Sequence, residues 1–69
     1  MTKNYDKFKS TIESIAERSI KTRNTSDNNS NVMTHYYWGE IQGILEVAAA
    51  VLNTKEYWAL CNFEKYLNY

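Results

Sequence analysis

The two side chains of this sequence best suited to covalent or acid–base chemistry are Cys61 and His35. A thiol becomes a nucleophile when a neighbouring base takes its proton, and His35 is the single histidine available for that role. If the helix carrying His35 runs antiparallel to the helix carrying Cys61, residues near position 46 lie opposite the cysteine instead. Cys61 is therefore expected to be buried as a small apolar side chain, and no catalytic residue is assigned.

Metal and cofactor chemistry has equally little support. One cysteine and one histidine make a His/Cys zinc site improbable on composition and allow no intrachain disulfide. The sequence has no glycine-rich phosphate loop, no carboxylate pair in a motif and no metal-ligand spacing. We therefore expect a protein that is not an enzyme, with no metal and no cofactor.

The aromatic triplet Tyr36-Tyr37-Trp38 could stack on a base or nucleotide. On a helix, however, consecutive residues are about 100° apart, so the three rings point in different directions and core packing is the favoured interpretation. An alternative remains open, in which a small ligand such as a nucleotide is held between two copies of the chain. Its phosphate would be neutralised from the first helix, and the residues nominated for this site are Tyr36, Trp38, Lys21 and Arg18.

Gly39 and Gly43 form the sharpest local signal, because two glycines one turn apart remove side chains from a strip of helix. Each glycine inside a helix costs about 1 kcal/mol relative to alanine, so a compensating close contact is expected. Val47 and Ala50 extend the strip. Its occupant could be the first helix of the same chain, a partner chain or a ligand, and the sequence leaves these open.

The elements that position these residues read as helices. Periodic apolar residues predict helices over about 4–22, 32–52 and 55–68, the first capped by Asn4, and a flexible polar connector over 24–31. Asn53 with Glu56 has the pattern of a capping box, which favours a break between the last two helices over one continuous helix. The fold class is thus all-α, a single small helical domain over 1–69 with two or three helices.

The central helix is apolar on two sides. The larger stripe, expected to be core, holds Met33, Tyr37, Ile41, Ile44, Leu45, Ala48, Val51 and Leu52. A helix that is apolar on two sides needs partners on both, and a chain of 69 residues offers few. In the last helix, Trp58, Tyr66 and Tyr69 lie away from the side of Leu60. We expect a helical homo-oligomer whose interface uses Tyr36, Gly39, Gly43, Val47, Ala50, Trp58 and Tyr66.

Charge narrows the choice of partner. The formal net charge is zero, with +3 over residues 1–23 (six basic, three acidic) and −3 over residues 24–69 (two basic, five acidic). This balance argues against nucleic acid as a partner. The sequence shows no signal peptide and no apolar run long enough for a membrane span, which predicts a soluble, cytoplasmic protein. The leading hypothesis is a non-enzymatic protein-interaction module, a small inhibitor, adaptor or regulator, that binds itself and another protein.

Overall fold

The computed structural model describes the backbone of residues 2–25, 30–67 and 69, and the side chains of residues 2–23, 34–67 and 69. It contains three helices, α1 (Lys3–Thr25), α2 (Ser30–Val51) and α3 (Thr54–Lys65), and no strand within those described residues. The all-α class is confirmed. None of the three helices is both long enough and apolar enough to cross a bilayer over the described residues.

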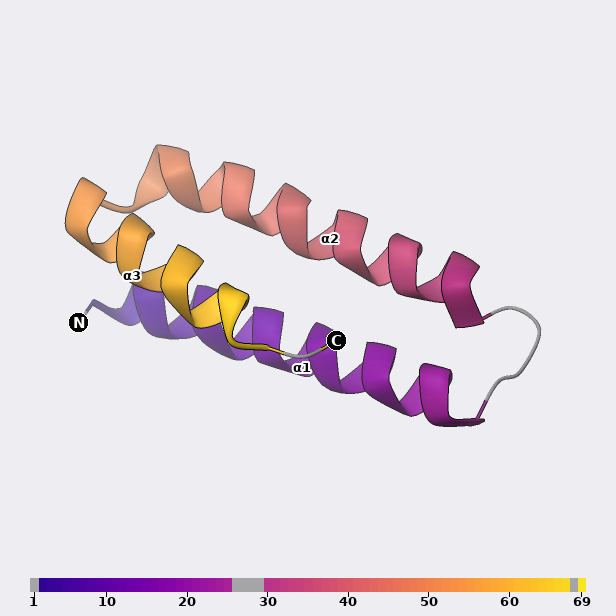
Figure 1. Ribbon diagram of the computed structural model, residues 1–69. Coiled ribbons are helices and arrows are strands. Elements are labelled where there is room, and N and C mark those ends of the chain that lie inside the picture. Colours follow the sequence, from indigo (N-terminus) through magenta and orange to yellow (C-terminus); the bar gives the residue numbers. More distant parts are fainter. Residues whose placement is uncertain (1, 26–29, 68) are drawn as a thin grey trace.

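The helices form an elongated bundle of about 40 × 16 × 16 Å. Helices α1 and α2 run antiparallel along the long axis, and α3 turns back to pack against both of them (Figure 1). Because α3 has 12 residues while α1 has 23 and α2 has 22, it covers only part of the pair. The other part, towards residues 25 and 30, has no third helix beside it (Figure 1).

The start of α1 differs from the expected one. The cap is Thr2 rather than Asn4, since the Thr2 Oγ1 atom accepts a hydrogen bond from the Tyr5 N–H at 3.3 Å. The hydroxyl of Thr2 accepts a hydrogen bond from an N–H of the first turn, which is the role that was expected of the Asn4 side chain. The first helical residue is therefore Lys3, and Asn4 lies inside the helix.

The break between α2 and α3 is confirmed. Asn53 is extended, with φ −71° and ψ 168°, and its side-chain oxygen accepts from the Glu56 N–H at 2.8 Å. Glu56 itself reaches a different target, because its Oε2 accepts from the Thr2 N–H at 3.0 Å and from the Thr2 hydroxyl at 2.7 Å. These bonds lower the pKa of the buried Glu56 carboxyl and tie the start of α3 to the start of α1.

Two other boundaries need correction. Helix α3 ends at Lys65, before the expected residue 68, because its last turn tightens: the Tyr66 N–H bonds to the Phe63 carbonyl and the Leu67 N–H to the Glu64 carbonyl. The polar connector is shorter than 24–31, since α1 runs through Thr25 and α2 begins at Ser30. Asn, Ser and Thr lower helix propensity by only tenths of a kcal/mol each, so a polar run can still extend a helix. Residues 26–29 lie outside the described residues.

The core gathers one side of each helix. From α1 it takes Tyr5, Ile12, Ile15 and Ala16; from α2 Ile41, Leu45, Ala48 and Leu52; and from α3 Leu60. The stripe expected for α2 is confirmed in its centre, with Tyr37 and Ile44 half-buried at its edges. Val51 was wrongly assigned to the core, because it lies at the margin of the stripe and is 51% exposed. Met33 lies outside the described side chains.

Candidate functional site

Among the described residues, none covers the side of α2 opposite its core stripe. Gly39 and Gly43 are exposed, and beyond the adjacent residues and the nearby backbone of α2 itself, a Cβ atom added to either would meet no heavy atom within 4 Å. The possibility that the first helix packs on this strip is therefore wrong. Helix α1 packs instead against the side of α2 that carries Ile41, Leu45 and Ala48, where larger side chains bury more apolar area.

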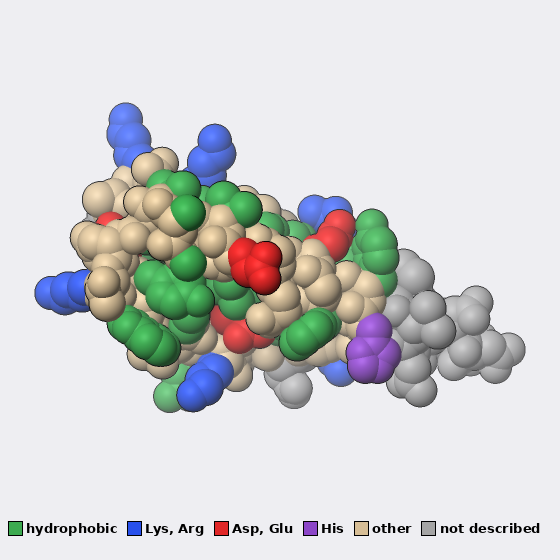
Figure 2. Space-filling view, turned by 90° about the horizontal axis from the view of Figure 1, so that it is seen from above, with side chains coloured by type: hydrophobic (Ala, Val, Ile, Leu, Met, Phe, Trp, Pro, Cys, Tyr) green, Lys and Arg blue, Asp and Glu red, His purple; other side chains and the backbone are tan. Residues whose placement is uncertain are grey.

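This side of α2, called the back face, also presents larger apolar groups to solvent. Tyr36 is 57% exposed and Val47 is 56% exposed, and Ala50 is exposed beside them. Figure 2 views the molecule from the α2 side and shows hydrophobic side chains in several separate patches, with an acidic side chain between them and Lys and Arg mainly at the edges. The five residues of the back face are Tyr36, Gly39, Gly43, Val47 and Ala50. One described helix thus carries apolar surface on two sides and buries only one of them.

A shallow groove between α1 and α2 continues this surface. It has a volume of about 350 Å³ and takes Asn4, Lys7, Phe8 and Thr11 from α1 and Ile44 and Val51 from α2. No residue of α3 lines it, although the groove lies at the end of the α1–α2 pair where α3 begins. Val51 and Ile44 lie next to the back face on the α2 surface. The groove, with Phe8, Ile44 and Val51 among its lining residues, therefore borders the back face.

The aromatic residues nominated on α3 occupy a different surface. Trp58 and Tyr66 are both exposed, Tyr66 at 87%, while Leu60 of the same helix is fully buried in the core. The rings of Trp58 and Tyr57 are in an edge-type contact, with centroids 5.8 Å apart. Because α3 packs on the core side of α2, the structure does not bring Trp58 or Tyr66 to the back face within one chain.

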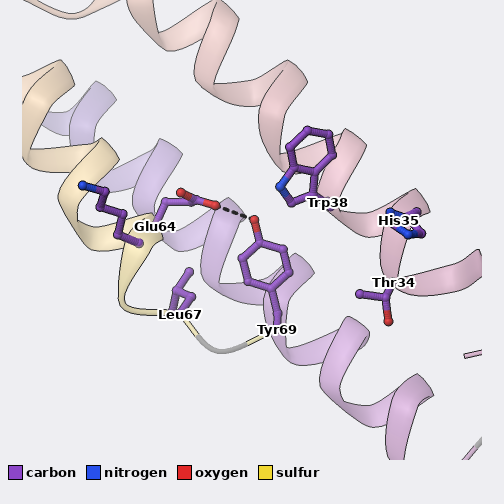
Figure 3. Close-up of a pocket in the computed structure, with 7 residues that line it drawn as sticks. Thr34, His35, Trp38, Glu64, Leu67 and Tyr69 are labelled. Carbon is purple, nitrogen blue, oxygen red and sulfur yellow. Dashed lines mark hydrogen bonds between the residues drawn. The ribbon is translucent and has the colours of Figure 1, made fainter. Parts of the chain in front are cut away.

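A second, larger hollow lies between the first half of α2 and the end of α3 (Figure 3). Its volume is about 640 Å³, and it is widely open to solvent. Helix α2 contributes Thr34, His35 and Trp38 to the walls. The end of α3 and the segment after it contribute Glu64, Lys65, Leu67 and Tyr69. This hollow, called the Trp38 cleft, exists because α3 ends before it covers the whole of α2.

Tyr69 forms one wall of the cleft and is held from three directions. Its hydroxyl donates a hydrogen bond to Glu64, and its carbonyl oxygen accepts from the Arg23 guanidinium at 3.2 Å and from the Ser19 hydroxyl at 3.5 Å. Burial, followed by the bond to Glu64 and the charge of that carboxylate, raises the pKa of the Tyr69 phenol. Tyr69 was expected on an outward side of the last helix, but the helix ends early and the ring packs against the core.

The residues nominated for a nucleotide are dispersed in one chain. Trp38 lines the cleft, whereas Tyr36 belongs to the back face, and the Tyr36 and Tyr37 rings meet edge to face with centroids 5.4 Å apart. Arg18 and Lys21 are exposed on α1 and line neither hollow. Core packing of the aromatic triplet holds for Tyr37 alone, since Tyr36 and Trp38 are more than half exposed.

The cysteine and the histidine are not paired. His35 lines the cleft and Cys61 does not. Cys61 is half-buried, so the expected burial is only partial, and a hydrogen bond with its thiol raises the pKa of the Tyr57 phenol. Among the described residues, no three His, Cys, Asp or Glu side chains are close enough together to hold a metal ion.

Comparison of the chain with protein-family models, with curated proteins and with solved structures finds no match. The three surfaces described above are therefore the basis for assigning a function. The back face and the α1–α2 groove are extended and apolar, which suits a macromolecular partner. The Trp38 cleft is concave and of a size that suits a small molecule.

Proposed function

We propose that this chain is a non-enzymatic protein-interaction module that self-associates through the back face of α2. In its assembled form it occupies a surface of another protein and acts as an inhibitor, adaptor or regulator in the cytoplasm. The observation that carries the proposal is the open glycine strip, because Gly39 and Gly43 have no neighbouring atom within 4 Å of an added Cβ.

Helix energetics support a second copy at this strip. The two glycines destabilise α2 by about 2 kcal/mol relative to two alanines, and no close contact at either glycine among the described residues offsets that loss. A helix from another copy can approach a glycine strip closely, so that backbone and Val47 gain van der Waals contacts that a larger side chain would block. The same contact removes the half-exposed Val47 and Tyr36 from water.

The size of the chain supports the same conclusion. A domain of about 60 residues buries only about 60% of its unfolded surface, and small domains commonly gain stability from disulfides, metals or oligomerisation. The sequence has one cysteine, and the described residues hold no metal-binding cluster. Association of two copies is a direct way to bury more apolar surface.

Sedimentation velocity tests the proposal with a matched pair of variants. Gly43→Leu places a branched side chain on the back face, and Ser10→Leu places the same side chain at an exposed position of α1 that lines neither hollow. We expect the wild type and Ser10→Leu to associate between about 1 and about 300 μM, and Gly43→Leu to remain monomeric. A wild type that stays monomeric over this range, or a Gly43→Leu variant that associates equally, would refute the proposed interface.

Binding to another protein is tested separately. The chain is purified from the cells that naturally produce it and measured by native mass spectrometry. One spectrum then reports the number of copies and the mass of any second protein. We expect a complex that holds two or more copies of the chain together with a second protein of defined mass. Recovery of the chain only with copies of itself would leave no basis for the inhibitor, adaptor or regulator role.

A further inference from the structure

The Trp38 cleft is a hollow that the described residues leave open to solvent. Its volume of about 640 Å³ falls within the range of about 300–1,000 Å³ typical of small-molecule sites. Leu67 and the rings of Trp38 and Tyr69 provide apolar walls from two parts of the chain that are distant in sequence (Figure 3). A ligand in this position would contact α2 and the segment after α3 at once.

The indole of Trp38 is open to solvent. Trp38 is 53% exposed. The aromatic contacts found among the described residues pair Tyr36 with Tyr37 and Tyr57 with Trp58, so the indole of Trp38 is not stacked on another ring. The face of an aromatic ring carries a negative quadrupole and attracts organic cations, most strongly in tryptophan.

The charges in the cleft favour the same sign of ligand. Glu64 is half-buried and its carboxylate accepts the Tyr69 hydroxyl, whereas the neighbouring Lys65 is exposed. A partly buried charge acts through a lower effective dielectric constant than an exposed one, so Glu64 outweighs Lys65 inside the cleft.

We propose that the Trp38 cleft binds a small organic cation that carries an aromatic ring, such as an aryl-substituted ammonium. The ammonium group lies against the face of the Trp38 indole, on the side of the Glu64 carboxylate. The aromatic ring lies against Leu67 and the ring of Tyr69. This site is independent of the back face, and either one can exist without the other.

Tryptophan fluorescence tests the site directly, because the chain has only two tryptophans. In a Trp58→Phe background, Trp38 is the single reporter, and Trp58 does not line the cleft. We expect benzyltrimethylammonium to change the Trp38 emission with a saturable curve, and to bind at least about fivefold more tightly than phenylacetate or benzyl alcohol. Absence of saturation up to about 10 mM, or equal binding of phenylacetate, would overturn the proposal.

Two variants locate the ligand, with affinity measured by calorimetry so that no tryptophan is needed. Trp38→Leu is expected to weaken the binding of benzyltrimethylammonium about tenfold, and Glu64→Gln about three- to tenfold. Glu64→Gln keeps an acceptor for the Tyr69 hydroxyl, so it tests the charge even if Trp38→Leu fails to fold. Unchanged affinity in a folded Glu64→Gln variant would show that the cation does not lie beside this carboxylate and would contradict the proposal.

Discussion

Replacing Gly43 with leucine should have opposite effects on the single chain and on its self-association. In one chain, Gly43 lies in a regular helix with open space where a side chain would begin. Leucine is a strong helix former and glycine a poor one, so the substitution stabilises α2 on its own. In the proposed oligomer the same side chain occupies the space that a second helix would use.

The magnitude for the single chain follows from helix propensity. Leucine is favoured over glycine by about 0.8 kcal/mol inside a helix, and no clash subtracts from this because an added Cβ meets nothing within 4 Å. For a domain of 60 to 100 residues, about 1 kcal/mol shifts the midpoint of thermal unfolding by about 4–8 °C. Gly43→Leu should therefore raise the melting temperature of the dilute protein by about 3–6 °C.

The assay is thermal unfolding followed by circular dichroism at several protein concentrations. The melting temperature of the wild type should rise with concentration, since association adds about 2.7 kcal/mol when the concentration is about a hundred times the dissociation constant. The melting temperature of Gly43→Leu should start higher and stay constant. A variant that melts below the wild type in dilute solution would mean that Gly43 is covered inside one chain. A melting temperature that rises as steeply as that of the wild type would mean that the back face is not the interface.

Three further predictions concern the single chain. Leu60→Ala empties a fully buried position and should lower the free energy of unfolding by about 2–5 kcal/mol in urea titrations, and a loss below about 1 kcal/mol would contradict the packing of α3. Asn53→Ala removes the cap of α3 and should lower the free energy of unfolding by about 1 kcal/mol. Asn53→Ser keeps an acceptor at this position and should largely avoid that loss. The pKa of Glu56 is lowered in the folded chain, so its carboxylate contributes fully to the free energy of unfolding above the ordinary pKa of a glutamate. That contribution is lost as the pH falls through the lowered value. Glu56→Gln should therefore make the free energy of unfolding less dependent on pH in acid, and lower it at neutral pH. An unchanged acid profile in that variant would show that Thr2 does not hold the carboxylate.

The sequence predicted those features of the fold that depend on contacts between residues close together in the chain. The break before α3 was predictable because Asn53 and Glu56 are three residues apart and the cap involves only them. The core stripe of α2 was predictable because a helical period places Ile41, Leu45 and Ala48 on one side whatever covers them.

The contacts that the sequence did not indicate join distant parts of the chain. The bonds between Thr2 and Glu56 span 54 residues, and those from Ser19 and Arg23 to Tyr69 span 50 and 46. These contacts depend on the residues at which α3 begins and ends. A sequence-based boundary that is wrong by a few residues therefore cannot predict them. The Trp38 cleft was missed for the same reason, since its walls meet only because α3 ends at Lys65.

The central claim is that a second copy of the chain covers the back face, and isotope-filtered NMR tests it most directly. In a mixture of ¹³C-labelled and unlabelled protein at a concentration where the chain associates, we predict nuclear Overhauser contacts between copies at the methyl groups of Val47 and Ala50. The buried methyl groups of Ile41 should show none, because they already face the core of their own chain. Val47 and Ala50 methyl groups that contact only water and their own chain would contradict the account.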